Sequence, residues 1–142
     1  MNSSKIQFQA RATGPDLFLT VKFDDNTVWS QPLGQDPVQI RHEFEDLNAA
    51  HELQLTLSGK QPQHTELDAQ GNIVSDRVVE ISQMQLDDIE LGLVFWNHSS
   101  YQHNFNGTAA DTQEKFYGVM GCNGTVTFEF ASPIYQWLLE NL

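Results

Sequence analysis

The stretch KIQFQARA, residues 5–12, decides the fold. Every second residue from Ile6 to Ala12 is apolar, and the residues between them are polar or charged. Successive side chains of a β-strand point to opposite faces, so this pattern indicates a strand with one buried face. The segment therefore predicts a protein built from half-buried strands.

The same period of two recurs through the first 60 residues. Gly14-Pro15 interrupts the first strand, and alternation returns over residues 17–23 until Asp24-Asp25-Asn26 supplies a turn. Residues 27–30 should pair back as a hairpin. Further alternating segments cover residues 38–44 and 53–57. The pattern predicts five strands with no helix between them.

The middle of the chain predicts two long loops around a strand pair. Residues 59–76 are mostly polar, which is typical of a long loop. Strand character returns at Val78, and the apolar run to residue 95 changes phase twice, as expected of two strands with bulges. Residues 99–115 are again largely polar and predict the second loop.

The last 20 residues predict a hairpin followed by a short helix. Asn123-Gly124 offers a two-residue turn ahead of the alternating residues 126–130. Ser132 can cap a helix that has Pro133 at its first position. About eight antiparallel strands and one short C-terminal helix predict an all-β protein, a two-sheet antiparallel β-sandwich that is jelly-roll-like. We expect residues 1–142 to form a single domain.

Charge excludes several partners. The 142 residues carry 19 Asp and Glu against 7 Lys and Arg, a formal charge of -12. Such a chain repels polyanions, so we expect no nucleic acid and no acidic membrane as a partner. No apolar run approaches the roughly 20 residues needed to span a bilayer, and the N-terminus shows no secretory signal. We expect a soluble, unprocessed product.

The sequence favours a protein that is not an enzyme. It contains no Gly-x-Ser-x-Gly elbow, no His-Glu-x-x-His pair and no phosphate-binding glycine loop. Cys122 lies beside the predicted turn, where a small residue is needed anyway. His98 and His103 could hold zinc or nickel, but exposed loop histidines explain them as well. With 19 acidic residues, a glycosidase-like carboxylate pair arises by chance.

Several Asx-rich turns suggest calcium. The ion takes six to eight oxygen ligands, which flexible loops rich in Asp and Asn provide. The candidate ligands are Asp68, Asn72, Asp76, Asp87 and Asp88. Their spacing is not that of an EF-hand, and solvated turns rich in Asx residues are the alternative interpretation.

The second predicted loop and its borders are unusually aromatic. Trp96, Tyr101, Phe105 and Tyr117 all fall there. Such rings either plug one end of the sandwich or form a recognition platform, because aromatic anchors dominate interface energetics. Both interpretations stay open at this point.

Two segments carry a resemblance to a known group of proteins. RVVEISQMQLDDIELG, residues 77–92, resembles an "LxIxxLxLDGIxL" strand pair, and YGVMGCNG, FEF and PIYQW, within residues 117–137, resemble a "YxGxNGxWxxxFxxPIxxWI" ending. Both patterns recur in small β-sandwich proteins of tailed phages of marine bacteria and cyanobacteria. That group is in turn similar to calcium-dependent xylan-binding modules. Asp88 replaces its usual glycine, and Thr125 stands where it often has tryptophan.

The resemblance implies a non-enzymatic phage virion protein. Under this hypothesis the chain is a capsid decoration or appendage module located in the virion. It would pack on its own copies as a homo-oligomer or on a shell protein, and calcium would stabilise it. The alternative is a free-standing calcium-dependent carbohydrate-binding module, whose partner is a glycan. A small acidic hydrolase is the third hypothesis.

Overall fold

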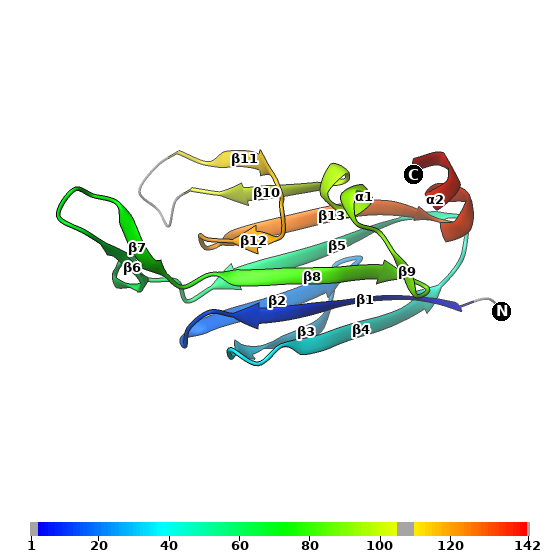
Figure 1. Ribbon diagram of the computed structural model, residues 1–142. Helices are drawn as coiled ribbons and strands as arrows, with labels where there is room; N and C mark the ends of the chain where they lie inside the picture. Colours follow the sequence, from blue (N-terminus) through cyan, green and yellow to red (C-terminus); the bar gives the residue numbers. More distant parts are fainter. Residues whose placement is uncertain (1–2, 105–109, 142) are drawn as a thin grey trace.

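The computed structural model describes residues 3–104 and 110–141, which form two packed antiparallel sheets (Figure 1). Sheet A has the order β12-β8-β1-β4, with β9 paired to β8, and sheet B has the order β11-β10-β13-β5-β2-β3. The strands of sheet A are β1 (Ser3–Ala12), β4 (Val38–Glu45), β8 (Val79–Leu86), β9 (Ile89–Glu90) and β12 (Val119–Met120). Those of sheet B are β2 (Leu17–Phe23), β3 (Asn26–Leu33), β5 (Ala49–Ser58), β10 (Ser99–His103), β11 (Thr112–Lys115) and β13 (Gly124–Ser132).

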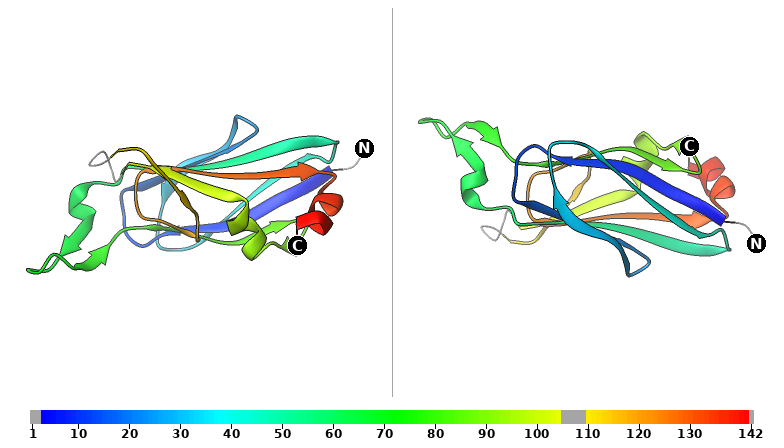
Figure 2. Two further views of the ribbon diagram at one scale, coloured as in Figure 1. Left: turned by 90° about the horizontal axis from the view of Figure 1, so that it is seen from above. Right: turned by 90° about the horizontal axis from the view of Figure 1, so that it is seen from below.

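Three further pieces lie around the sandwich. The helix α1 (Leu93–Asn97) lies beside the start of β10, and α2 (Ile134–Asn141) follows β13 and packs against it (Figure 1). A 3-10 turn, Pro62–His64, leads into a hairpin of β6 (Thr65–Leu67) and β7 (Ile73–Asp76) that projects beyond the sheets (Figure 2). The predicted two-sheet β-sandwich with a short C-terminal helix is confirmed. Within the described residues no helix is both long and apolar enough to cross a bilayer.

The period-two pattern fills the core as the sequence predicts. In β1 every even-numbered residue from Ser4 to Ala12 is buried, and the odd-numbered residues face outward. The inner faces of β2, β5 and β13 meet this row with fully buried leucine, valine and phenylalanine side chains. Phe128 lies at the aromatic centre, with ring centroids 5.1 Å from Phe95 and 5.3 Å from Phe130. Burial of these side chains is the main force that holds the sheets together.

Four local predictions are wrong. Residues 59–76 contain the β6–β7 hairpin, residues 93–97 are helical, and the predicted loop at 99–115 contains β10 and β11. The Asn123-Gly124 hairpin does not form, because β12 pairs with β8 in sheet A whereas β13 begins at Gly124 in sheet B. A Cβ at Gly124 would lie 2.3 Å from the carbonyl oxygen of Gln102. This glycine therefore serves the close approach of β10 rather than a turn.

The start of α2 also differs from the prediction. The first helical N–H, that of Ile134, donates to Oδ1 of Asp46 at 3.2 Å, so Asp46 supplies the cap from another part of the chain. The Ser132 hydroxyl is used elsewhere, 3.0 Å from Nε2 of His51. The buried face of the helix is made by Ile134 and Leu138, with Trp137 partly buried beside them.

A buried ion pair anchors the β6–β7 hairpin. The side chain of Lys60 is 1% exposed, and its Nζ donates to Oδ1 of Asp76 and to the carbonyl oxygen of Arg77. The same Asp76 oxygen accepts from the Thr65 hydroxyl at 2.7 Å. The Asn123 side chain holds the backbone of Lys60 by two hydrogen bonds, at 2.9 and 3.0 Å. The base of the hairpin is thus fixed to the sandwich.

Candidate binding groove

A surface groove of about 470 Å³ lies where β8, α1 and β12 meet. The aromatic wall of this groove, Trp96 and Tyr117, is supported by two buried phenylalanines. Phe95 in α1 and Phe116 before β12 pack edge to face, with ring centroids 5.8 Å apart. The residues that follow them, Trp96 and Tyr117, both line the groove.

Trp96 and Tyr117 form an aromatic pair in which Tyr117 is exposed and Trp96 is half-buried against the core. Their ring centroids are 6.0 Å apart and the planes meet at 73°. Tyr117 is 62% exposed, and the ammonium of Lys115 lies 5.7 Å from its ring centroid. Leu93 and Val119, both exposed, extend the apolar surface around the groove.

Gly118 allows the wall to approach β8. Its φ is +98°, and its carbonyl oxygen accepts from the N–H of Ile81 at 2.8 Å. A Cβ at this position would lie 3.3 Å from the Ile81 carbonyl oxygen and 3.8 Å from Nε1 of Trp96. Glycine is favoured here because few other residues adopt this backbone conformation and because the space is narrow.

The part of the lining that comes from β8 and β9 carries polar side chains. Glu80, Ser82 and Gln83 come from β8, and Glu90 comes from β9. A bulge places Ser82 and Gln83 together on the surface, because β8 has one residue more than β1 between the paired positions Gln7 and Gln9. Gln83 has a φ of +55°, a strained conformation that bulges beside binding sites often show. The sequence signal for this bulge was the change of phase within residues 78–95.

The groove therefore joins an aromatic wall to a row of hydroxyl, amide and carboxylate groups. The aromatic side offers an apolar contact with defined geometry, and the polar side offers hydrogen-bond donors and acceptors. An arrangement of this kind suits a small ligand that has one apolar face and a polar rim.

One of the predicted binding aromatics, Tyr101, does not lie in the groove. Tyr101 is 6% exposed, and its hydroxyl donates to the carbonyl oxygen of Cys122 and accepts from the Cys122 N–H at 3.0 Å. The structure therefore places Tyr101 in the core, where strand β10 directs it inward, and corrects its assignment to a binding surface. Phe105 lies outside the described residues.

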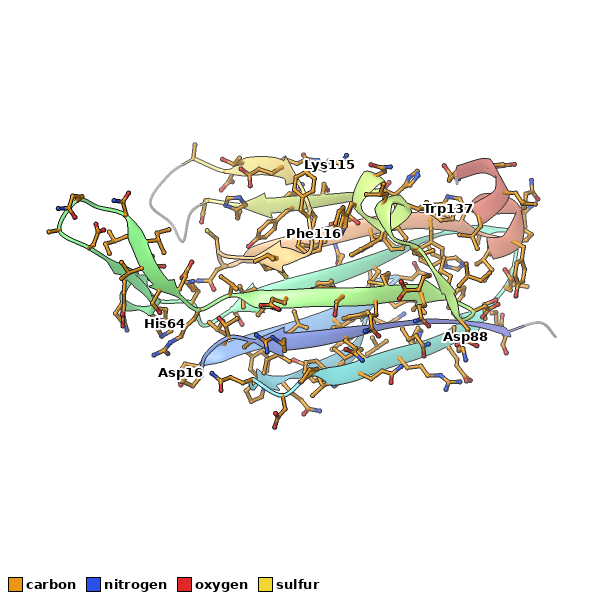
Figure 3. The ribbon with its side chains drawn as sticks, in the orientation of Figure 1. Asp16, His64, Asp88, Lys115, Phe116 and Trp137 are labelled. Atoms are coloured by element: carbon orange, nitrogen blue, oxygen red, sulfur yellow. The ribbon has the colours of Figure 1, made fainter. Side chains whose placement is uncertain are left out.

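The five predicted metal ligands lie in different places. The Asp68 carboxylate accepts the backbone N–H groups of Gln70 and Asn72, both at 2.9 Å, which lowers its pKa and closes the tip of the β6–β7 hairpin. Asp76 is the partner of Lys60 at the base of that hairpin. Asp87 accepts from Lys5 N at 2.8 Å at the far end of the sandwich, where Figure 3 labels its neighbour Asp88.

Turn geometry explains the positions of two of these aspartates. Asp87 and Asp88 have φ of +48° and +67°, the conformation of a tight hairpin turn between β8 and β9. Among residues 3–104 and 110–141, no three His, Cys, Asp or Glu side chains come together as a metal site.

A hydrogen-bonded Ser-His-Asp chain lies beside a second hollow. His51 Nε2 is 3.0 Å from the Ser132 hydroxyl, and its Nδ1 is 2.8 Å from Oδ2 of Asp24. A nucleophilic serine must be accessible, and the N–H of the following residue often stabilises the oxyanion. Ser132 is 3% exposed and is followed by Pro133, which has no N–H. The chain of hydrogen bonds ties β13 to β5 and to the β2–β3 turn.

Comparison with known proteins identifies a shared fold. No protein-family model matches the chain, and no curated protein matches it. It is similar to the selenomethionine form of vCBM60, which is reported with circular permutation as an evolutionary link between two families of calcium-dependent carbohydrate binding modules. The identity is 13%, the TM-score is 0.58, and the match covers 88% of this chain and 89% of that one. It is also similar to vCBM60 in complex with galactobiose, at 15% identity and a TM-score of 0.50, over 87% and 96% of the two chains.

Proposed function

We propose that this protein is a non-catalytic carbohydrate-binding module whose groove between β8, α1 and β12 holds sugar rings. The observation that carries the proposal is that the Trp96–Tyr117 pair and the polar side chains of β8 line the same groove. The fold shared with vCBM60 supports it. A carbohydrate-binding module was the alternative in the sequence analysis, and the groove and the shared fold support it better than the virion reading.

The chemistry of the groove matches that of a pyranose. One face of such a ring exposes C–H groups, and its rim carries hydroxyls. The C–H face would pack on the negative π surface of Trp96 or Tyr117, as an aromatic edge does. Ser82 and Gln83 can donate and accept hydrogen bonds at the rim, and the Glu90 carboxylate can accept them.

Removing the aromatic wall should abolish most of the glycan affinity. We expect Trp96→Ala or Tyr117→Ala to weaken binding by about 1–3 kcal/mol, which is roughly 5- to 150-fold, because aromatic anchors carry such values. The measurement is retention on an array of neutral oligosaccharides and in polysaccharide-containing native gels, followed by calorimetry on the best ligand.

Tyr135→Ala is the matched control. Tyr135 is 55% exposed, comparable to Tyr117, but it lies on α2 away from the groove lining. It should leave both affinity and melting temperature unchanged. If Tyr135→Ala weakened binding as much as Tyr117→Ala does, the groove would not be the site.

Calcium binding is a separate proposal, which the Asx-rich turns and the resemblance motivate. If calcium binds the β6–β7 turn, millimolar calcium should raise the melting temperature, and Asp68→Ala should abolish the rise. Asp68 is the informative position because it lies in an exposed turn, whereas a change at Asp76 would also break the ion pair with Lys60. Equal melting temperatures with calcium and with chelator would leave the aspartates as turn and ion-pair residues.

The virion location is likewise a proposal, and it rests on the sequence resemblance. One protein can have both roles, because a decoration protein on a virion can also bind surface glycans. Mass spectrometry of purified particles tests this directly. Presence in many copies would support a decoration protein, and absence would leave a free-standing module.

A further inference from the structure

We propose that the binding surface continues from the groove across the outer face of sheet A and takes an extended, uncharged polysaccharide chain. This inference rests on the proposed function and specifies its ligand. It concerns the polar residues of β8, β1 and β4, which lie side by side in this order (Figure 1).

A row of amide side chains crosses these three strands. Gln39 of β4 donates from Nε2 to Oε1 of Gln7 in β1 at 3.2 Å, and Gln7 donates in turn to Oε1 of Gln85 in β8 at 2.6 Å. Gln7 Nε2 also donates to Oδ1 of Asp88 at 3.2 Å, which uses both of its N–H donors. Each amide has two N–H donors and two acceptor lone pairs, so the row keeps acceptor capacity on all three glutamines and donor capacity on Gln39 and Gln85 for hydroxyl groups. The mutual hydrogen bonds also hold the row in one arrangement, which reduces the entropy lost on binding.

The bulge in β8 joins this row to the groove. Ser82 and Gln83 both face outward, and both line the groove. Ser82 also pairs in register with Gln9 of β1, which pairs in turn with Gln39 of β4. A ligand that leaves the aromatic wall therefore meets hydroxyl and amide groups continuously from β8 to β4.

The cations along the row are held in ion pairs. Each of the three cations on this face has an acidic partner, and the pairs are Lys5–Asp88 at 3.0 Å, Arg11–Glu80 at 3.2 Å and Arg41–Glu43 at 2.8 Å. Glu45 of β4 and Glu90 of β9 add two further exposed carboxylates, so this face keeps a negative charge, in line with the formal charge of -12. A neutral chain gains hydrogen bonds there, whereas an anionic chain would meet the field of the whole protein.

The dimensions require more than one sugar unit. Neighbouring strands lie about 4.8 Å apart, so the row from β8 to β4 spans roughly 10 Å beyond the groove. A single ring in the groove cannot reach Gln39. Affinity should therefore increase with chain length.

The test compares short and long ligands. Calorimetry would measure disaccharides and hexasaccharides of neutral xylo-, gluco-, manno- and galacto-series. For the series that binds, we expect the hexasaccharide to bind at least about tenfold tighter than the disaccharide. Gln7→Ala and Gln39→Ala should each lower the affinity for the hexasaccharide by about two- to tenfold, which corresponds to the loss of one neutral hydrogen bond. The affinity for the disaccharide should stay unchanged.

Controls separate this inference from the proposed function. Gln31 is an exposed glutamine on β3 of the other sheet, so Gln31→Ala should leave the affinity for both ligands unchanged. Equal affinities for both lengths, or an unchanged hexasaccharide affinity in Gln7→Ala and Gln39→Ala, would overturn the extended site while the groove stands. Polygalacturonate binding as tightly as the neutral polymer would overturn the neutral-chain specificity. If none of the neutral oligosaccharides bound, both the proposed function of the groove and the extended site would be wrong.

Discussion

Asp76→Ala should lower the free energy of unfolding by about 3 kcal/mol. The substitution leaves the ammonium of Lys60, whose side chain is 1% exposed, buried without its carboxylate. Breaking one partner of a buried ion pair costs roughly 3–5 kcal/mol, and the 26% exposure of Asp76 reduces this value. Urea denaturation followed by intrinsic fluorescence measures the change.

Two companion variants test the cause. Lys60→Met in the Asp76→Ala background should restore part of the loss, because the buried charge is gone and the side-chain volume is similar. Asp16→Ala removes an exposed ion pair with Arg77 in the same region and should cost less than about 1 kcal/mol. If Asp76→Ala were as mild as Asp16→Ala, Lys60 would have to reach water or another partner.

Tyr101→Ala should destabilise the protein by about 3–5 kcal/mol, as truncation of a buried aromatic does. The ring lies 6.0 Å from Phe116, which supports the groove wall, and burial raises the pKa of its hydroxyl. Tyr101→Phe should cost only about 1 kcal/mol, since it keeps the packing and loses the hydrogen bonds to Cys122.

The exposed Tyr117 provides the comparison. Tyr117→Ala should change the free energy of unfolding by less than about 0.5 kcal/mol, the usual range for surface positions. Chemical denaturation of the three variants side by side gives the result. Comparable destabilisation by Tyr101→Ala and Tyr117→Ala would contradict the division into a core ring and a surface ring.

The sequence predicted those parts of the fold in which one face of a strand is buried and the other exposed. Alternation is strong in β1, β2 and β5, and the structure places these strands where it was found. It is weak in β6 and β7, because the projecting hairpin exposes Leu67, Ile73 and Val74 and buries no apolar row. Pairing of two such strands depends on the anchor at Lys60, which no local pattern reveals.

The sequence predicted only part of the candidate site, for a similar reason. The density of aromatic residues located the region of Trp96 and Tyr117, but composition could not separate rings that point outward from rings that point inward. The buried residues of β10 are Ser99, Tyr101 and His103, and two of them are polar types usually assigned to loops. The amide row required the pairing of three strands distant in sequence, which alternation alone does not determine.

The fixed base of the β6–β7 hairpin has a consequence for how this chain can diverge. Its contacts with the sandwich described above come from its two ends, through Lys60, Asn123 and Asp76, while its tip projects beyond the sheets. Exposed loop tips tolerate insertions and deletions. Relatives could therefore lengthen or shorten the hairpin, or change its surface residues, without altering strand register or the groove. This element can thus acquire a new binding specificity independently of the rest of the domain.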